Sequence, residues 1–305
     1  MLPIIHHDAY VARDVPATHR FPMGKFRAVA ERCVALGLVK DFESFHRPVP
    51  APESWLQLAH SPAYVSQVLT QTVPAPLERV IGFKMTAPVA MRSRCAVAGT
   101  ALAARLALEH GAACNTAGGS HHAAYDGGAG FCVFNDVAVA ARLMQAEGLA
   151  RRILVIDLDV HQGDGTARIF ENDASVFTLS VHCEQNWPRR KAVSDMDVGV
   201  ERGTGDDDYL RVARSAVIDA LEASRPDLVF FNAGVDPHRE DRLGLLDLTD
   251  EGLKKREAMV FDEVLRRGVP VVGVLGGGYS RDIDALARRH AFLHEAAAEA
   301  MRVRA

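Results

Sequence analysis

The chain has 305 residues, of which 48% are hydrophobic and 24% are charged, and its formal net charge is -4. These values are ordinary for a globular protein with a large core, and they lack the basic excess of a general nucleic-acid binder. No apolar run approaches the roughly 18 to 20 residues that span a bilayer, and the polar N-terminus does not resemble a secretory signal. We therefore expect a cytoplasmic protein.

Short apolar runs predict the β-strands. They are continuous rather than alternating, as expected for parallel strands that are buried on both faces. In chain order the predicted strands cover residues 3–5, 112–115, 153–156, 176–179, 228–231 and 269–275, and the predicted helices cover residues 89–110, 135–147, 206–223, 250–267 and 283–301. Strands that alternate with helices imply right-handed crossovers and a mostly parallel α/β sheet.

Two segments do not fit this alternation. Residues 40–88 mix prolines with short helical pieces, and residues 183–205 form a long polar stretch. A loop of that length inside a compact domain is usually functional or mobile. We interpret residues 183–205 as part of a binding-site rim rather than a disordered insertion.

The five cysteines are scattered along the chain and form no Cys-x-x-Cys pair. This spacing argues against a disulfide framework and against a zinc site made of thiolates. Reduced cysteines in a cytosolic protein are the simpler interpretation.

Polar and glycine-rich segments follow four of the predicted strands. Because ligands bind beyond the carboxyl ends of the strands in an open α/β sheet, we expect these segments to meet at one rim. They are Gly-Gly-Ser-His-His at 118–122, the segment 157–165, Asn-Ala-Gly-Val-Asp at 232–236 and Gly-Gly-Gly-Tyr at 276–279.

Asp159, His161 and Asp236 are the candidate metal ligands. Asp159 and His161 are two residues apart, so in an extended segment their side chains share one face, and Asp236 can reach the same ion from another strand end. Two carboxylates and one imidazole leave room for water and a substrate oxygen, as in catalytic zinc sites. The alternative, an aspartate-rich turn that caps the next helix, accounts for none of the neighbouring histidines.

His121 and His122 are the candidate proton-transfer groups. Each imidazole needs a partner on its second nitrogen, and Asp157 and Asp164 flank the metal motif and can serve as those partners. Tyr279 follows three glycines and could donate a hydrogen bond to an oxyanion near the metal. Taken alone, the histidine pair could be a solvated loop and Tyr279 could simply pack at a strand end.

The order and content of these segments resemble those of the zinc-dependent histone deacetylases and their bacterial relatives. The N-terminal His-Arg-Phe-Pro-Met and the 183–205 loop look closest to the class IV branch. The matching motifs cover residues 118–123, 130–136, 157–166, 232–238, 241–244 and 276–279.

The resemblance implies a single domain over residues 1–305 with the three-layer arginase/deacetylase-like α/β fold. It implies an amidohydrolase that removes an acetyl or other acyl group from an N-acylated amine such as acyl-lysine, with zinc on the candidate triad. His121 and His122, paired with Asp157 and Asp164, become the general acid/base pair, and Tyr279 becomes the oxyanion donor. The implied substrate channel is lined by Gly130, Phe131, Trp187 and Gly277, although the alignment of Trp187 is loose. A structural potassium ion is implied at Asp157, Asp159, His161, Ser180 and Val181.

Three alternatives stay open at this point. A deacylase of acetylpolyamines or other small amides would use the same core. A binuclear manganese ureohydrolase would need carboxylates where Gly163 and His238 stand, and a non-catalytic acyl-lysine binder would be expected to lack Tyr279, a histidine or a metal ligand. Gln162, where many eukaryotic members have a second histidine, is expected to face away from the metal. The acidic net charge gives no support for a nucleosome-bound role, and the sequence indicates neither the acyl-chain preference nor the oligomeric state.

Overall fold

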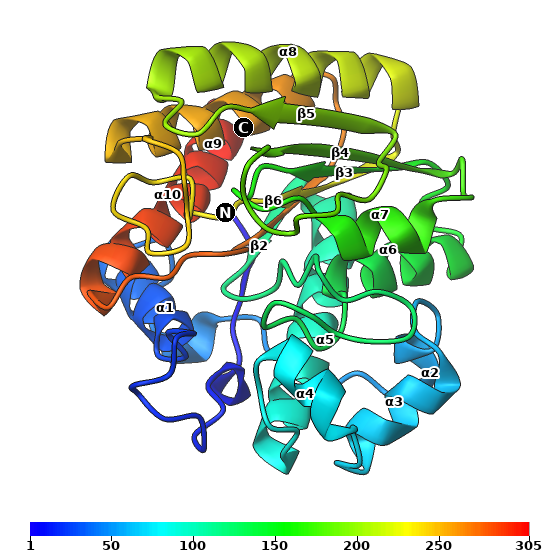
Figure 1. Cartoon of the computed structure of the whole chain (residues 1–305). Coiled ribbons are helices and arrows are strands. Elements are labelled where there is room, and N and C mark those ends of the chain that lie inside the picture. The colour runs from blue at the N-terminus through cyan, green and yellow to red at the C-terminus, as the bar shows by residue number, and fades with distance from the viewer. Residues whose placement is uncertain (305) are drawn as a thin grey trace.

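A central sheet of seven strands organises the computed structural model, which describes residues 1–304 (Figure 1). The sheet order is β1-β2-β7-β6-β3-β4-β5, and every neighbouring pair is parallel. The strands are β1 (Ile4–Ile5), β2 (Ala112–Asn115), β3 (Ile153–Asp157), β4 (Val176–Cys183), β5 (Met196–Val200), β6 (Leu228–Asn232) and β7 (Val271–Val274). This pairing confirms the predicted parallel α/β sheet. The apolar strands β2, β3, β6 and β7 are buried throughout, as their continuous apolar runs predict.

Helices cover both faces of the sheet and make the fold three-layered (Figure 1). One layer consists of α5, α6 and α7, and the other consists of α1, α10, α9 and α8. The α-helices are α1 (Lys25–Ala35), α2 (Glu53–Leu56), α3 (Pro62–Leu69), α4 (Ala75–Ile81), α5 (Ala87–His110), α6 (Asp136–Ala146), α7 (Asp164–Phe170), α8 (Asp206–Ser224), α9 (Asp250–Leu265) and α10 (Ile283–Arg302), and the 3-10 turns are η1 (Asp8–Tyr10) and η2 (Phe42–Ser44).

The long helices begin at residues whose side chains cap the first turn. Thr86, Asn135, Thr249 and Asp282 each accept a hydrogen bond from the backbone N–H three residues later. Such caps satisfy backbone donors that have no partner within the helix. All five predicted helices start within a few residues of their expected positions, four of them at these caps and α8 after Gly205, which has no side chain to cap it.

The sequence did not predict β5 or α1. The interpretation of residues 183–205 as a loop was therefore wrong in part, because Met196–Val200 pairs in parallel with β4 at the edge of the sheet. Its exposure alternates along the strand, since one face of this edge strand meets solvent, so it lacks the continuous apolar run of the buried strands. In α1, charged residues interrupt the apolar pattern and conceal the helix.

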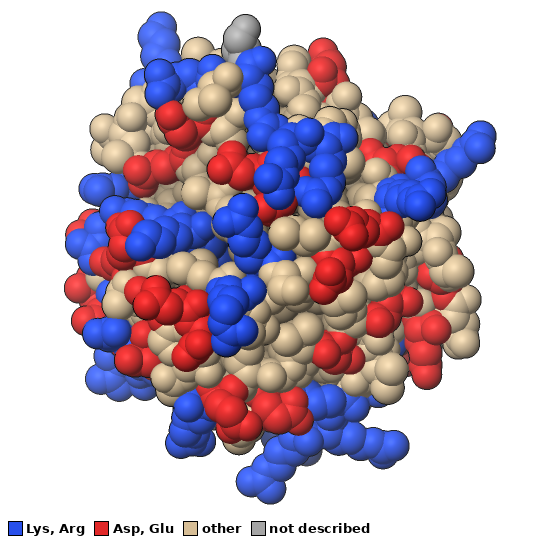
Figure 2. All heavy atoms as spheres, turned by 90° about the horizontal axis from the view of Figure 1, so that it is seen from above, with Lys and Arg blue, Asp and Glu red and all other residues tan. Residues whose placement is uncertain are grey.

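The helices and the surface charge agree with the expectations from composition. Within residues 1–304, no helix is both long and apolar enough to cross a bilayer. On the face around α8, acidic and basic side chains are interspersed (Figure 2). All five cysteines are unpaired and buried, in agreement with the absence of a disulfide framework.

Candidate active site

Asp159, His161 and Asp236 meet where β3 and β6 end. The Nδ1 atom of His161 lies 3.1 Å from an oxygen of Asp159 and 3.1 Å from an oxygen of Asp236. One donor atom from each residue lies within 4.8 Å of the other two, and within residues 1–304 no other group of three His, Cys, Asp or Glu residues is arranged in this way. The sequence-predicted triad is therefore assembled in space.

The electrostatics of this triad fit a divalent cation. Both carboxylates are almost fully buried, and their like charges face each other across the imidazole. Burial, followed by the neighbouring Asp159, raises the pKa of Asp236 to about 7. A cation between the two carboxylates would relieve this repulsion, and two carboxylate oxygens with one imidazole nitrogen suit zinc.

Backbone donors hold the two carboxylates in place. The N–H of Val160 donates to Asp236 at 2.9 Å, and the N–H of Gly277 donates to Asp159 at 2.7 Å. A Cβ atom at position 277 would lie 2.1 Å from an oxygen of Asp236, so only glycine lets the backbone approach this closely. Gly277, expected as a substrate-binding residue, therefore contacts the metal ligands directly.

Each histidine of the adjacent pair is bound to its own aspartate. His121 Nδ1 lies 2.7 Å from Asp157, and His122 Nδ1 lies 2.8 Å from Asp164. The two rings are 4.0 Å apart between centroids, and both are buried. The pairing expected from sequence is the one the structure contains, and it leaves the Nε2 atom of each ring for other partners.

The two histidines are pushed toward opposite protonation states. Although burial opposes the charged form, the carboxylates of Asp157 and Asp159 raise the pKa of His121 to about 9. Burial and the positive charge of His121 lower the pKa of His122 to about 3. A pair whose pKa values diverge in this way supports a division of labour between one charged and one neutral imidazole.

Sequence reasoning missed two residues that fix this pair. Asp136, at the start of α6, accepts hydrogen bonds from the backbone N–H groups of Gly119 (3.1 Å) and Ser120 (2.8 Å). Asn232 donates to Asp157 at 2.9 Å. Both lie inside motifs that the sequence singled out, and the signal that could have found them is a polar side chain directly at a helix start or a strand end.

Tyr279 lies beside the triad with its ring centroid 6.2 Å from that of His161. Its backbone N–H donates to Asp241 at 2.7 Å, and Asp241 also accepts from Leu243 and Gly244. Burial, with the nearby Asp236, raises the pKa of the Tyr279 hydroxyl well above its ordinary value. The phenol therefore stays protonated and can act as a hydrogen-bond donor.

An open cavity of about 320 Å³ leads to the triad, and three of the four residues expected to line the channel lie in its wall. Gly130 and Phe131 both have positive φ angles, of 53° and 68°. The ring centroid of Phe131 lies 5.8 Å from that of Tyr279. Trp187 lies in the same wall, and Gly277 lines the small space behind Tyr279 instead. The complete lining is Arg20, His122, Gly130, Phe131, His161, Asn186, Trp187, Leu243 and Tyr279.

Three of the five residues expected to hold potassium, Asp157, Ser180 and Val181, lie on the neighbouring strands β3 and β4, and the other two, Asp159 and His161, follow the end of β3. Asp157 pairs in register with Ser180, and Val181 follows Ser180 on the buried strand.

Gln162 faces away from the triad, as expected: its side-chain amide donates to the Ala192 carbonyl at 3.0 Å and to Asp197 at 2.7 Å. It tethers the segment that precedes β5.

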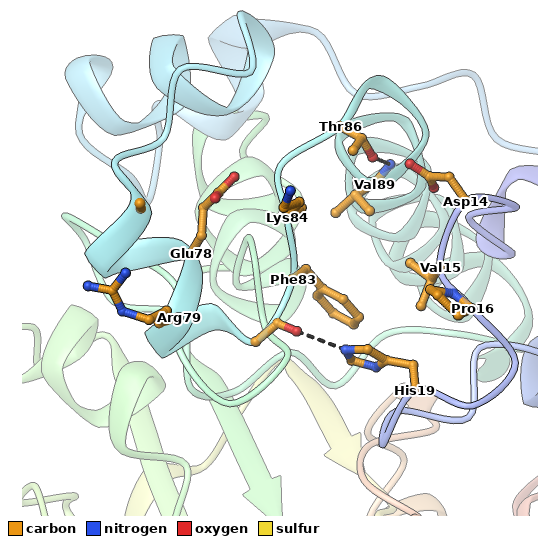
Figure 3. A pocket seen from close by; sticks show the side chains of 12 residues that line it. Asp14, Val15, Pro16, His19, Glu78, Arg79, Phe83, Lys84, Thr86 and Val89 are labelled. Atoms are coloured by element: carbon orange, nitrogen blue, oxygen red, sulfur yellow. Dashed lines mark hydrogen bonds between the residues drawn. The ribbon is translucent and has the colours of Figure 1, made fainter.

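A larger cavity of about 650 Å³ lies beside the site and contains none of its chemical groups. Figure 3 shows its base, where the ring of His19 stacks on that of Phe83 with centroids 5.1 Å apart. Both rings also contact Phe131, at 5.9 Å and 5.7 Å, so they lie between this cavity and the channel wall. The candidate active site is therefore identified by its chemical groups and not by the volume of its cavity.

Comparison with known proteins agrees with this geometry. The family model described as the histone deacetylase domain matches residues 19–294. An uncharacterized protein of Picosynechococcus sp. is 48% identical over 295 residues, which cover 97% of this chain and 98% of that protein. Histone deacetylase 2 of Arabidopsis thaliana is 32% identical over 272 residues, covering 86% of this chain and 70% of that protein.

Two further similarities are more distant. A probable deacetylase of Methanothermobacter thermautotrophicus is 33% identical over 180 residues, which cover 55% of this chain and 53% of that protein. The crystal structure of the HDA15 HD domain superposes with a TM-score of 0.81 at 24% sequence identity, covering 98% of this chain and 90% of that one. At that identity the superposition supports the fold alone.

Proposed function

The chain belongs to the histone deacetylase family, and from this premise we propose that it is a zinc-dependent amidohydrolase that removes an acyl group from acyl-lysine. One observation carries the proposal. A buried triad that can hold a metal ion lies beside two histidines, each bound to a separate aspartate, and a protonated tyrosine, and one cavity reaches this cluster at His122, His161 and Tyr279. That is the set of groups that amide hydrolysis by an activated water requires.

Asp159, His161 and Asp236 are the residues that would hold the zinc ion. When bound there, zinc would polarise the scissile carbonyl and lower the pKa of a bound water from about 15.7 toward 7. The protein's own part is to present three ligands of fixed geometry and to leave the cavity side open for water and substrate.

His122 is the proposed general base. Its Nδ1 is taken by Asp164, so Nε2 is the nitrogen available to take a proton from the attacking water and then give it to the leaving amine. His121, held by Asp157 and favouring the charged form, stabilises the negative charge that develops on the reacting centre. The Tyr279 hydroxyl donates a hydrogen bond to the former carbonyl oxygen. The products are a carboxylic acid and a free amine.

The channel wall favours acyl-lysine over an acetylpolyamine. Phe131, Trp187 and Leu243 provide apolar surface for the methylene chain of lysine. Among residues 1–304, Arg20 is the one lining residue with a permanent charge, and no carboxylate of this range lines the cavity. A polyamine carries further ammonium groups, and these would meet a like charge and no counter-charge at the mouth. Deacetylation of a polyamine is therefore the second candidate function.

We also propose that Asp157, Asp159, His161, Ser180 and Val181 hold a potassium ion behind the zinc site. Support comes from the register of β3 and β4, which sets the Asp157 carboxylate and the Ser180 hydroxyl on neighbouring strands.

A second catalytic metal has no comparable support. At position 163 there is no side chain, and His238 is bound to Asp250 at 3.2 Å and to the backbone N–H of Glu240 at 3.1 Å.

A substrate panel tests the proposal. Purified protein loaded with zinc is incubated with acetyl-lysine peptide, longer acyl-lysine peptides and acetylpolyamines, and the free amine is quantified by mass spectrometry. We expect turnover of at least one acyl-lysine peptide, with a kcat/KM above that for acetylpolyamines. Binding without release of amine would identify a non-catalytic acyl-lysine binder, and turnover of polyamines alone would favour the second candidate.

A further inference from the structure

One buried guanidinium group bridges the two segments that carry the metal ligands. Arg256, on α9, is fully buried, and its Nη1 atom donates to the carbonyl of Leu158 at 3.0 Å and to the carbonyl of Gly234 at 2.8 Å. Leu158 directly precedes Asp159, and Gly234 lies two residues before Asp236. A single side chain thus ties the end of β3 to the end of β6 behind the triad.

The partner of Arg256 is its neighbour in sequence. Glu257 is equally buried and accepts hydrogen bonds from Nε and Nη2 of the guanidinium group, the first at 3.1 Å. This leaves Nη1 for the two carbonyls. Because a buried ion pair is often no more stabilising than well-packed apolar residues of the same size, stability alone does not account for a charged pair at this position.

The bridge acts on the two backbone segments that set the spacing of the metal ligands. The Asp159 and Asp236 carboxylates each lie 3.1 Å from Nδ1 of His161, so a change in the separation of their two segments would alter the spacing of the ligands. Gly234 also packs against Asp159 so closely that a Cβ atom there would lie 2.2 Å from a carboxylate oxygen. A small shift of the Gly234 backbone would therefore move a metal ligand.

Arg256 is a side chain that opposes such a shift, because it donates to a backbone carbonyl on each of the two segments. Tyr209 also donates to the Leu158 carbonyl, at 3.3 Å, but it makes no hydrogen bond to Gly234. Lysine could not replace arginine fully, because its compact ammonium group lacks the planar set of donors that serves a carboxylate and two carbonyls together.

We propose that Arg256 is a positioning residue that fixes the separation of Asp159 and Asp236 and so sets the affinity of the site for its metal. The proposal rests on the proposed function only in that these two aspartates bind the ion. It concerns the backbone that carries the ligands, since Arg256 donates to backbone carbonyls and does not line the substrate cavity.

Two altered proteins and one matched control test this role. Arg256→Lys keeps a positive charge beside Glu257, and the double variant Arg256→Met with Glu257→Leu removes both charges together, so neither leaves a buried charge unpaired. Tyr209→Phe removes a hydrogen bond to the Leu158 carbonyl and keeps the two hydrogen bonds that Arg256 donates to the backbone carbonyls. For each protein, the zinc dissociation constant is measured by competition with a chelator, the visible spectrum of the cobalt-loaded form reports ligand geometry, and the melting temperature is measured without metal.

We expect zinc affinity to fall about 10-fold in Arg256→Lys and about 10- to 100-fold in the double variant, with an altered cobalt spectrum in both. Tyr209→Phe should stay within about 2-fold of the wild type. Unchanged affinity and an unchanged cobalt spectrum in Arg256→Lys would overturn the proposal, whatever happens to the melting temperature. Failure of the wild-type protein to bind zinc would instead overturn the proposed function, and the positioning role with it.

Discussion

The ring of Trp187 stands edge-on against the ring of His122, with centroids 4.4 Å apart and planes at 84°. Edge-to-face contacts of this kind are favourable beyond the area they bury. Trp187 is 41% exposed, so it covers the proposed base while its outer side meets solvent at the channel mouth. Trp187, whose alignment was loose in the sequence, thus contacts the proposed general base His122 directly.

Replacing Trp187 should therefore weaken substrate binding without unfolding the protein. We expect Trp187→Ala to lower kcat/KM for an acetyl-lysine peptide about 10-fold, because loss of the ring removes part of the channel wall and an aromatic contact of about 0.5–1.5 kcal/mol. Trp187→Phe keeps a ring edge and should lose less. Steady-state kinetics on the three proteins checks this, and an unchanged kcat/KM in Trp187→Ala would exclude a role for the ring in the channel.

Tyr279→Phe removes a single hydroxyl from the site. The ring should keep its packing against Phe131, and the backbone hydrogen bond to Asp241 should remain. We expect kcat to fall about 10²- to 10³-fold, the usual effect of removing an oxyanion donor, while zinc content and KM change little. Full activity in Tyr279→Phe would show that the oxyanion is stabilised elsewhere.

Arg20 should set the preference for substrate charge. The side chain is exposed and lines the channel, so a change there should alter the charge of the mouth without disturbing the core. We expect Arg20→Glu to raise the kcat/KM for acetylspermidine about 10-fold relative to that for acetyl-lysine peptide, with Arg20→Gln intermediate, because a like charge becomes an opposite one. The ratio should approach the wild-type value at high salt. A ratio that does not respond to either substitution would remove the case against polyamines.

Buried neutral histidines should make the fold sensitive to mild acid. Burial lowers the pKa of His60 and of His294 from 6.5 to about 4. At a pH between about 4 and 6.5, these two histidines bind protons in the unfolded chain but not in the folded protein. The stabilisation is therefore complete above about pH 6.5, and about 3 kcal/mol for each residue is lost as the pH falls toward 4.

His294→Leu should reduce this loss. The pH dependence of the free energy of unfolding, measured on metal-free protein by urea denaturation between pH 4 and 7, should become shallower by up to about 1.4 kcal/mol per pH unit. His110→Leu, which replaces an exposed histidine by the same residue, is the matched control. An identical slope in His294→Leu would mean that this histidine does not remain neutral in the folded protein.

The parts of the site that the sequence predicted are those carried by strand ends. Asp159, His161, Asp236 and the histidine pair follow apolar strands directly, and parallel strands bring their carboxyl ends to one edge. Asp157 and Asp164 were expected as partners of the histidine pair because they flank the metal motif and each ring needs a partner, and the structure pairs His121 with Asp157 and His122 with Asp164.

The parts that were missed depend on contacts between distant segments. Arg20 lies 102 residues from His122 in sequence yet lines the same cavity, and no local pattern indicates this. Arg256 looks like a surface charge in the sequence and is fully buried in the fold. The edge strand β5 escaped prediction because its exposed positions, Asp197 and Gly199, break the apolar run.

Titration of the metal-free protein with zinc, with hydrolysis of an acetyl-lysine peptide measured at each step, tests the proposed metal-dependent deacetylation most directly. The rate should start near zero, rise with added zinc and level off at about one ion per chain, since one triad of ligands is present within residues 1–304. Asp236→Ala should stay inactive throughout the titration. Full hydrolysis without metal, or a plateau reached only at two ions per chain, would contradict a single-zinc amidohydrolase.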